Sequence, residues 1–273
     1  MAIKRYTANS DNSITNAYGS NLSTRGTGSN AGAADILETF SIYGQESSGS
    51  SELSRILIQF PVSDIQTDRS NSVIPASGSV SFFLNLYNAP HSTTLPRDFK
   101  LTVNAVNGSW EEGYGLDLDN YTDLTYDKIG SNWIRKAGST SWSTAGGDIY
   151  TDSSSSFEQT FTKGTEDLSV NITTLVEQWI SGGSLGDKDN NGVLIKLSAS
   201  YEATSSTNLE GAVVSYYTKK FFARDSEFFF ERPTIEARWD STTQDDRAAF
   251  YFSSSLATKS ENLNTLYLYN YAR

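Results

Sequence analysis

Apolar and polar residues alternate along much of this chain, and this period of two is typical of strands that are buried on one face. The clearest segment, residues 77–87, places Val80, Phe82, Leu84 and Leu86 on one face, which we expect to lie in the core. The same pattern predicts further strands at residues 35–43, 54–61, 99–106 and 234–239, and an edge strand with a loop within residues 10–30. The pattern therefore indicates an all-β protein.

One segment departs from this period. Residues 170–180 begin as a strand and then place Leu175, Val176 and Trp179 at helical spacing. We therefore expect one short helix, whereas the stretch around Ile65 is expected to be a turn.

Composition favours strands as well. The chain has 273 residues, among them 15 Tyr and 14 Phe, and it lacks long stretches of Leu, Ala, Glu and Lys. Aromatic side chains suit pleated, half-buried surfaces. We expect one large β-sandwich domain over residues 1–240 and a C-terminal extension of two strands over residues 241–273.

The net charge, and the lack of membrane spans, cysteines and an apolar leader, limit which partners and locations the sequence predicts. The formal net charge of −11 repels a polyphosphate backbone, so nucleic-acid binding is not expected. No apolar run approaches the length of a membrane span, and the absence of cysteine rules out disulfides and thiolate metal sites. The first residues contain no apolar leader, which indicates synthesis in a cytoplasm. Such a sandwich would leave the cell by a route other than export, and a virion particle is such a route.

Residues 113–150 form a connection that is too long to be passive in a compact domain. We expect it to be either a packed cover over one sheet or a binding surface. Trp110, Trp133 and Trp142 lie beside or within it, and their rings could form a platform for a sugar. Tryptophan is more often buried, so we expect at least two of these three in the core, together with Trp179 and Trp239.

Residues 187–192 match the first half of an oxygen-rich calcium loop. Asp187, Asp189 and Asn191 occupy alternate positions, and Gly192 stands at the bend. The acid expected six residues after the glycine is instead Ser198, and Asp, Asn and Gly also form ordinary turns. Calcium is the one cofactor that the sequence suggests, and an ordinary turn is the alternative.

The sequence offers no arrangement that predicts an enzyme. Glu111 and Glu112 adjoin Trp110, but neighbouring strand residues point to opposite faces, whereas glycoside hydrolysis needs two carboxyl groups that face each other. We expect this pair to cap or anchor a loop. His91, the single histidine, lies in a loop without the residues of a catalytic triad or a two-histidine metal site.

Two groups of apolar residues are hard to bury within one sandwich. The run Phe228, Phe229 and Phe230 points to both faces of any strand, which indicates a buried subunit interface, and a loop tucked over the sandwich edge is the alternative. The C-terminal extension has two strand-like segments that cannot form a stable domain alone. We expect them to pair with another subunit or to begin a further domain. The interface residues predicted in this extension are Phe250, Phe252, Leu266 and Leu268.

The order of several short motifs carries a family resemblance. The motifs are Arg55–Phe60, the strand at residues 79–87, Trp110–Gly113, Trp142 before Gly146-Gly147-Asp148, Val170–Thr173 with Val176 and Trp179, Phe222–Ser226, and Arg232-Pro233. Over about residues 1–240 the chain resembles the DNRLRE domain, a jelly-roll-like β-sandwich of surface and carbohydrate-associated proteins. It resembles more closely the variants of this domain in virion structural proteins of tailed phages, particularly marine ones. Here Arg224-Asp225-Ser226 replaces the usual Arg-Glu-Ser turn, and Asn171 replaces the commoner Asp.

The resemblance implies a non-enzymatic virion structural protein, attached to a phage head, neck or tail and made in the host cytoplasm. Its expected partners are other virion proteins and copies of itself, and the C-terminal strands are the expected docking element. The alternative is a carbohydrate-binding or adhesion module that binds a host surface glycan through the tryptophans of residues 113–150, with or without calcium.

Overall fold

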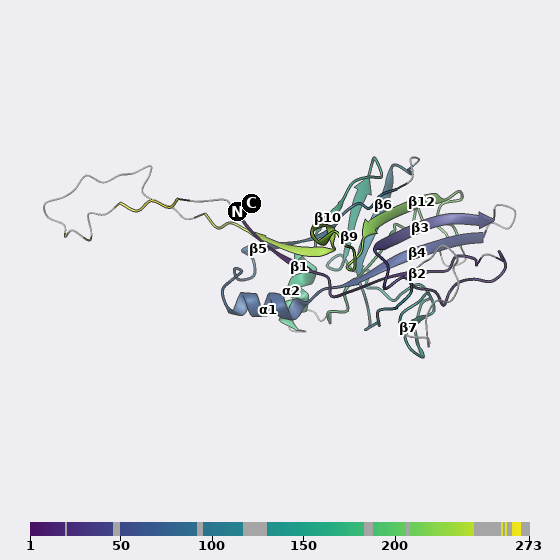
Figure 1. Cartoon of the computed structure of the whole chain (residues 1–273), viewed down its shortest axis with the longest axis horizontal. Coiled ribbons are helices and arrows are strands. Elements are labelled where there is room, and N and C mark those ends of the chain that lie inside the picture. Colours follow the sequence, from purple (N-terminus) through teal and green to yellow (C-terminus); the bar gives the residue numbers. More distant parts are fainter. Residues whose placement is uncertain are drawn as a thin grey trace.

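The computed structural model describes residues 1–19, 21–45, 50–91, 95–116, 130–182, 188–205, 208–242, 258, 260 and 264–268. Two antiparallel sheets face each other, and two helices lie beside the smaller one (Figure 1). The predicted all-β, jelly-roll-like sandwich is confirmed. Among the described residues, no helix has both the length and the apolar character that crossing a bilayer requires.

The smaller sheet has four antiparallel strands in the order β1-β13-β5-β10. Their bounds are Ala2–Thr7 for β1, Thr234–Trp239 for β13, Val80–Leu86 for β5 and Leu168–Asn171 for β10. The first and last parts of the sandwich chain thus lie side by side, with Ala2 opposite Trp239 and Thr7 opposite Thr234. The alternation at residues 77–87 and 234–239 predicted two of these strands closely.

The larger sheet has the order β12-β3-β4-β11-β6-β9, and β2 pairs with β4. The bounds are Tyr216–Phe222 (β12), Ile36–Gln45 (β3), Ser50–Gln59 (β4), Val193–Leu197 (β11), Phe99–Ala105 (β6), Ser156–Phe161 (β9) and Ser10–Thr15 (β2). The first half of β4 pairs with β3, and its second half pairs with β2 and β11. A separate hairpin joins β7 (Arg135–Ala137) to β8 (Thr140–Ser141).

The expectation of one helix is corrected, because the described residues contain two α-helices. The predicted one is α2 (Thr173–Ser181), whose Leu175, Val176 and Trp179 are buried as expected. The other, α1 (Val62–Ser70), occupies the stretch that was expected to be a turn. The sequence did not predict α1, because only two of its residues, Val62 and Ile65, are apolar and buried, and two residues do not define a helical face. Strand β12 was not among the strands predicted from the sequence.

The two helices are joined to each other by an ion pair, and a polar side chain just before α2 hydrogen-bonds to its first residue. Both guanidinium nitrogens Nη1 and Nη2 of Arg69 donate to the carboxylate of Glu177 at 2.7 Å. Asn171 Oδ1 accepts hydrogen bonds from the amide and the hydroxyl of Thr173, which satisfies orphan donors at the start of α2. Gly182 ends α2 with a φ of 56°, a left-handed conformation that suits glycine.

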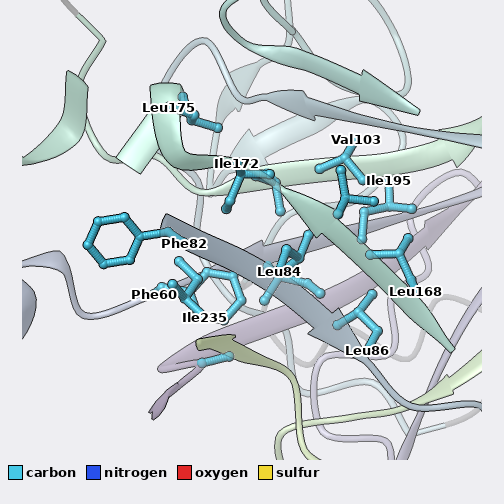
Figure 2. Packing of buried hydrophobic residues seen from close by; sticks show 14 of the residues in the cluster. Phe60, Phe82, Leu84, Leu86, Val103, Leu168, Ile172, Leu175, Ile195 and Ile235 are labelled. Atoms are coloured by element: carbon cyan, nitrogen blue, oxygen red, sulfur yellow. The ribbon is translucent and has the colours of Figure 1, made fainter. Parts of the chain in front are cut away.

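The main core lies between the sheets. Phe82, Leu84 and Leu86 of β5 form one cluster with Val103 of β6 and Ile195 of β11 (Figure 2). Removing these side chains from water supplies the main stabilisation of the sandwich, roughly 25 cal/mol per Å² of apolar surface. The predicted core face of residues 77–87 is confirmed.

The structure describes only a small part of the predicted C-terminal extension. Residues 264–268 belong to no strand, and Leu266 and Leu268 are 49% and 92% exposed. Phe250 and Phe252 lie outside the described residues. Trp179 is buried as expected, whereas Trp239 is only partly buried against the main core.

Candidate functional site

The larger sheet is apolar on both faces, and its outer face carries a second core. Trp110, Trp133 and Trp142 are 8%, 6% and 5% exposed and pack with Leu57 of β4 and Leu194 of β11. The described parts of the long connection are therefore a packed cover over one sheet, as one of the two interpretations proposed. All three tryptophans are buried, so the expectation of at least two is confirmed. None of these three indole rings therefore leaves a broad face exposed for a sugar to stack on.

Hydrogen bonds fix two of the three rings. The indole Nε1 of Trp110 donates to the carbonyl of Asn191 at 2.8 Å. The indole Nε1 of Trp142 donates to the carbonyl of Asn132 at 2.9 Å. A buried indole N–H needs such a partner, so these contacts define how the cover sits on the sheet.

Glu111 and Glu112 anchor this cover, as expected. Glu112 Oε1 accepts the amide of Asp11 at 2.7 Å and Nη2 of Arg224 at 3.1 Å. Glu111 Oε2 accepts the amide of Gly138 at 3.2 Å. The two carboxylates thus have separate structural partners and do not face each other. Two of the resembling motifs, around Trp110 and around Arg224, meet here in an ion pair.

Asp11 is the buried acid of this contact. Its Oδ2 accepts the amide of Arg224 at 2.6 Å, while its Oδ1 has no hydrogen-bond partner in the described structure. Burial raises the pKa of Asp11 to about 7, the Arg224 amide opposes the rise, and the charge of Glu112 adds to it. Sequence reasoning missed this residue, because its single carboxyl group lies in a polar stretch.

His91 anchors a loop to strand β12. One ring nitrogen, Nε2, lies 3.0 Å from Oδ1 of Asn88 and 3.4 Å from the amide of Lys220. Burial lowers the pKa of His91 to about 4, and the charges of Lys219 and Lys220 add to the effect. Burial also lowers the pKa of Lys219 to about 8, although its ammonium group donates to Asn88 and to the carbonyl of Gly164.

The proposed calcium loop is described only in part, because Asp187 lies outside the described residues. Asp189 is exposed, and the amide of Asn191 donates to its backbone carbonyl at 2.9 Å. Within the described ranges, no three acidic or histidine side chains are grouped so that they could hold a metal. Gly192 adopts a φ of +77°, and a Cβ there would meet the carbonyl oxygen of Ile58 at 2.1 Å. The described part of the loop is a tight turn against β4.

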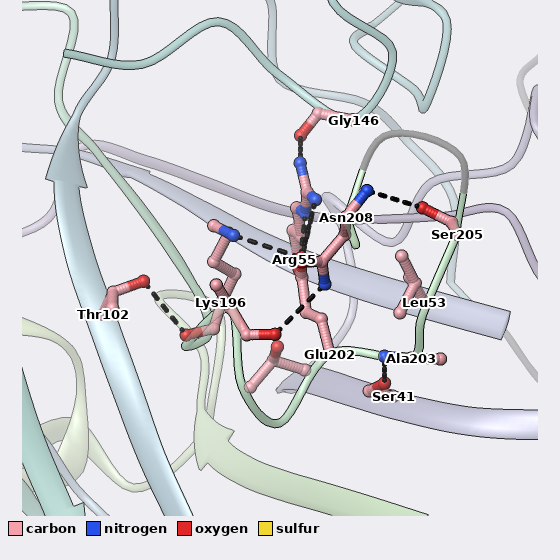
Figure 3. A network of polar contacts seen from close by, with 12 residues as sticks. Ser41, Leu53, Arg55, Thr102, Gly146, Lys196, Glu202, Ala203, Ser205 and Asn208 are labelled. Atoms are coloured by element: carbon pink, nitrogen blue, oxygen red, sulfur yellow. Dashed lines mark hydrogen bonds and ion pairs between the residues drawn. The ribbon is translucent and has the colours of Figure 1, made fainter. Parts of the chain in front are cut away.

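Figure 3 shows a polar cluster that sequence reasoning did not identify. Arg55 of β4 donates through Nε and Nη2 to the two carboxylate oxygens of Glu202, at 3.2 Å each, and through Nη1 to the carbonyl of Gly146 at 2.9 Å. Lys196 Nζ lies 3.1 Å from Glu202 Oε2. The Arg55 guanidinium also lies 5.0 Å from the ring of Trp133. The sequence did contain one sign of this cluster: Arg55 and Lys196 are charged residues that adjoin the apolar runs of strands β4 and β11.

This cluster lines a cavity of about 420 Å³ whose other walls are mostly small or polar. Two cations and one carboxylate leave the lining with one formal positive charge. The pKa of Lys196 is lowered, first by burial and then by the charge of Arg55. The cavity suits a small polar solute that carries a negative group, because such a solute would balance the excess charge. Its lining residues are Asn16, Ser51, Leu53, Arg55, Trp133, Thr144, Ala145, Lys196, Ala199, Glu202, Ala203, Ser205 and Asn208.

The phenylalanine run lies on the surface. Phe228, Phe229 and Phe230 are 52%, 60% and 78% exposed, and the last two belong to the 3₁₀-helix η3 (Phe229–Glu231). Phe228 packs against Phe222 with ring centroids 5.2 Å apart, and the guanidinium of Arg232 lies 5.3 Å from the ring of Phe229. The run is therefore an exposed aromatic patch on a short, fixed element.

No protein-family model matches this chain, and no curated protein matches it.

Proposed function

We propose that this chain is a non-enzymatic virion structural protein, a component of the neck, tail or capsid surface of a tailed phage. After synthesis in the host cytoplasm it would assemble with other virion proteins and with copies of itself. Its apolar edges would bind the particle, and its polar loops would face outward. This role requires no cofactor, nucleic acid or membrane.

The exposed aromatic patch is the observation that supports this proposal best. Three adjacent phenylalanines in water are unfavourable unless a partner covers them, and aromatic residues are enriched at the centres of protein interfaces. The patch is also preorganised: Arg232 donates through Nε and Nη2 to the carbonyl of Ser226, at 2.9 and 2.8 Å. A preorganised patch loses little entropy when a partner binds.

Mass spectrometry of purified phage particles tests the proposal. Peptides of this chain should be present in copy numbers comparable to those of known structural components, and gold-labelled antibody should mark a fixed place on the particle. A host protein of similar abundance, carried through the same purification, is the control. Absence of the chain from washed particles would contradict the proposal.

A carbohydrate-binding or adhesion module remains the second candidate. The three buried tryptophans no longer support it, but the cavity beside Arg55 does, because its amide and hydroxyl side chains could bind sugar hydroxyl groups. The excess positive charge favours an acidic glycan. Glycan-array binding that falls about tenfold in Lys196→Met and is retained in Lys100→Met would favour this candidate. An array without signal would remove it.

A further inference from the structure

A second cavity, of about 530 Å³, lies between strand β1 and helix α1. Four consecutive residues of β1, numbers 4–7, line one wall, and Pro61, Asp64, Thr67 and Asp68 line the other. Successive side chains of a strand point to opposite faces, so four consecutive residues can line one cavity only along the edge of the strand. The cavity is therefore a groove beside a sheet edge.

The register shows which backbone groups face this groove. The amide of Ala8 donates to the carbonyl of Pro233 at 2.9 Å, which makes Ala8 and Pro233 a hydrogen-bonded pair. Such pairs alternate along an antiparallel ladder, so the even-numbered residues of β1 bond to β13. The N–H and C=O groups of Ile3, Arg5 and Thr7 then point away from β13. In the described structure none of these groups has a hydrogen-bond partner.

The path of β4 explains why this edge is open. Two residues beyond the groove, the amide of Asn9 donates to the carbonyl of Gln59 at 3.0 Å, and β2 then pairs with β4. Pro61 follows, and the chain turns into α1 instead of continuing beside β1. Lys4 and Tyr6 hold the helix in place through Asp68, at 2.6 and 2.7 Å. The groove is thus the position that a further strand would fill.

We propose that this groove is a β-augmentation site that takes the apolar C-terminal segment around Leu266 and Leu268 of a second copy of this chain. The inference deepens the proposed function, since it rests on assembly through strand edges and names the edge and its occupant. An extended segment would give its backbone groups to Ile3, Arg5 and Thr7, as in other strand-addition complexes.

The C-terminal segment suits the groove because both are formally neutral and because the residues of the segment favour strands. The groove has Lys4 and Arg5 against Asp64 and Asp68, so its formal charge is zero. Residues 264–271 carry no formally charged side chain and consist largely of Leu and Tyr, which favour strands. Residues 264–268 lie away from the sandwich of their own chain, with Leu266 and Leu268 exposed (Figure 1). A second copy would cover both the edge and the segment, and reciprocal exchange would give a symmetric pair.

The test measures self-association of the full chain by sedimentation across a range of concentrations. The wild type should form dimers as concentration rises. Arg5→Pro should weaken dimerisation about tenfold or more, because proline removes the N–H that faces the groove. Arg5→Ala is the matched control: it loses the same contact with Glu236 but keeps the N–H, so dimerisation should change less than about threefold.

A second pair of variants examines the occupant. Leu268→Asp should weaken dimerisation about tenfold, whereas Leu209→Asp, at another strongly exposed leucine, should leave it unchanged. Thermal unfolding of all four variants checks that each is folded. A wild type that stays monomeric overturns the inference. So does dimerisation that is equally strong in Arg5→Pro and Arg5→Ala, or in Leu268→Asp and Leu209→Asp.

These outcomes are independent of the particle experiment. A chain that is present in phage particles but monomeric in solution would retain the proposed function and lose this inference. A chain that dimerises through β1 but is absent from particles would retain the inference and lose the proposed function.

Discussion

At the scale of single residues, burial decides how ionisable groups behave. Asp11 and His91 are both moved by burial toward their neutral forms, with pKa values of about 7 and about 4. Asp152 shows the opposite shift: Ser154, Ser155 and Lys188 hydrogen-bond to its carboxylate and lower its pKa, with Ser154 the largest cause. The pKa values of these two aspartates therefore shift in opposite directions, because the carboxyl group of Asp11 is buried with one unpaired oxygen, whereas that of Asp152 accepts several hydrogen bonds.

Asp11 predicts a specific pH dependence of stability. Its pKa of about 7 in the folded chain lies above the ordinary 3.8, so over that interval the folded state holds a proton that the unfolded chain has released. Its stabilising effect is complete below about pH 4 and is lost as the pH rises through about 7. Between about pH 5 and pH 8, the free energy of unfolding should fall by about 3 kcal/mol more in the wild type than in Asp11→Asn.

Urea unfolding followed by tryptophan fluorescence measures this difference at each pH. Other ionisable groups contribute equally to both proteins and cancel in the comparison. Parallel pH profiles for the wild type and the variant would contradict the assignment.

At the scale of elements, a close backbone approach decides where the turn before β11 can lie. Gly192 has a φ of +77° and lies against the backbone of β4, whereas Gly78 has a φ of +85° with no atom within 4 Å of a Cβ. Both positions favour glycine for conformational reasons, but only Gly192 also lacks the space for a methyl group.

This difference predicts unequal effects of the same substitution. Gly78→Ala should cost about 1 kcal/mol of unfolding free energy, which is the cost of the strained φ alone. Gly192→Ala should cost more than about 3 kcal/mol, since the backbone of β4 must also move. Equilibrium unfolding of the two variants gives the comparison. Equal losses would show that the turn yields without disturbing β4.

The tryptophan cover is the second feature at this scale. Trp142→Ala should lower the free energy of unfolding by about 3–5 kcal/mol, because it empties a buried site and removes the partner of the Asn132 carbonyl. Tyr114→Ala, at an exposed position on the same connection, should change it by less than about 1 kcal/mol. Unfolding followed by near-ultraviolet circular dichroism reports both. A stable, well-packed Trp142→Ala protein would mean that the cover is dispensable.

At the scale of the whole molecule, two of the exposed apolar stretches stand out as candidates for assembly. These are the aromatic patch at residues 228–230 and the described part of the C-terminal extension. The three tryptophans of the cover, by contrast, are buried. Under the proposed function, a formal charge of −11 would make free copies repel one another, and these two stretches would supply the specific contacts that overcome the repulsion.

The aromatic patch should matter for assembly and not for folding. Phe229→Ser combined with Phe230→Ser should leave the melting temperature within a few degrees, because exposed substitutions change stability by about 0.5 kcal/mol or less. Under the proposed virion role, incorporation of the tagged chain into phage particles should fall about tenfold or more. Leu209→Ser, at an exposed leucine elsewhere, is the control and should be incorporated normally. Normal incorporation of the double variant would show that the patch is not the docking surface.

Much of the sandwich was readable from the sequence, because local patterns encode strands directly. The alternation of Val80, Phe82, Leu84 and Leu86 specified a buried face without reference to any neighbour, and helical spacing around Trp179 specified α2. Strand β12 was missed because its exposed end and buried Lys219 give no clean alternation. Helix α1 was missed because two apolar residues are too few to define a helical face.

The sequence by itself determined the all-β class, about half of the strands and the burial of the three tryptophans of the cover, because these depend on side-chain periodicity and on the transfer of apolar groups from water. The tertiary structure alone decided which distant residues meet: Arg55 with Glu202, Asp11 with Arg224, and the free edge of β1 with the side of α1. Those meetings depend on strand order and register, which bring together residues far apart in the chain, and no local period records them.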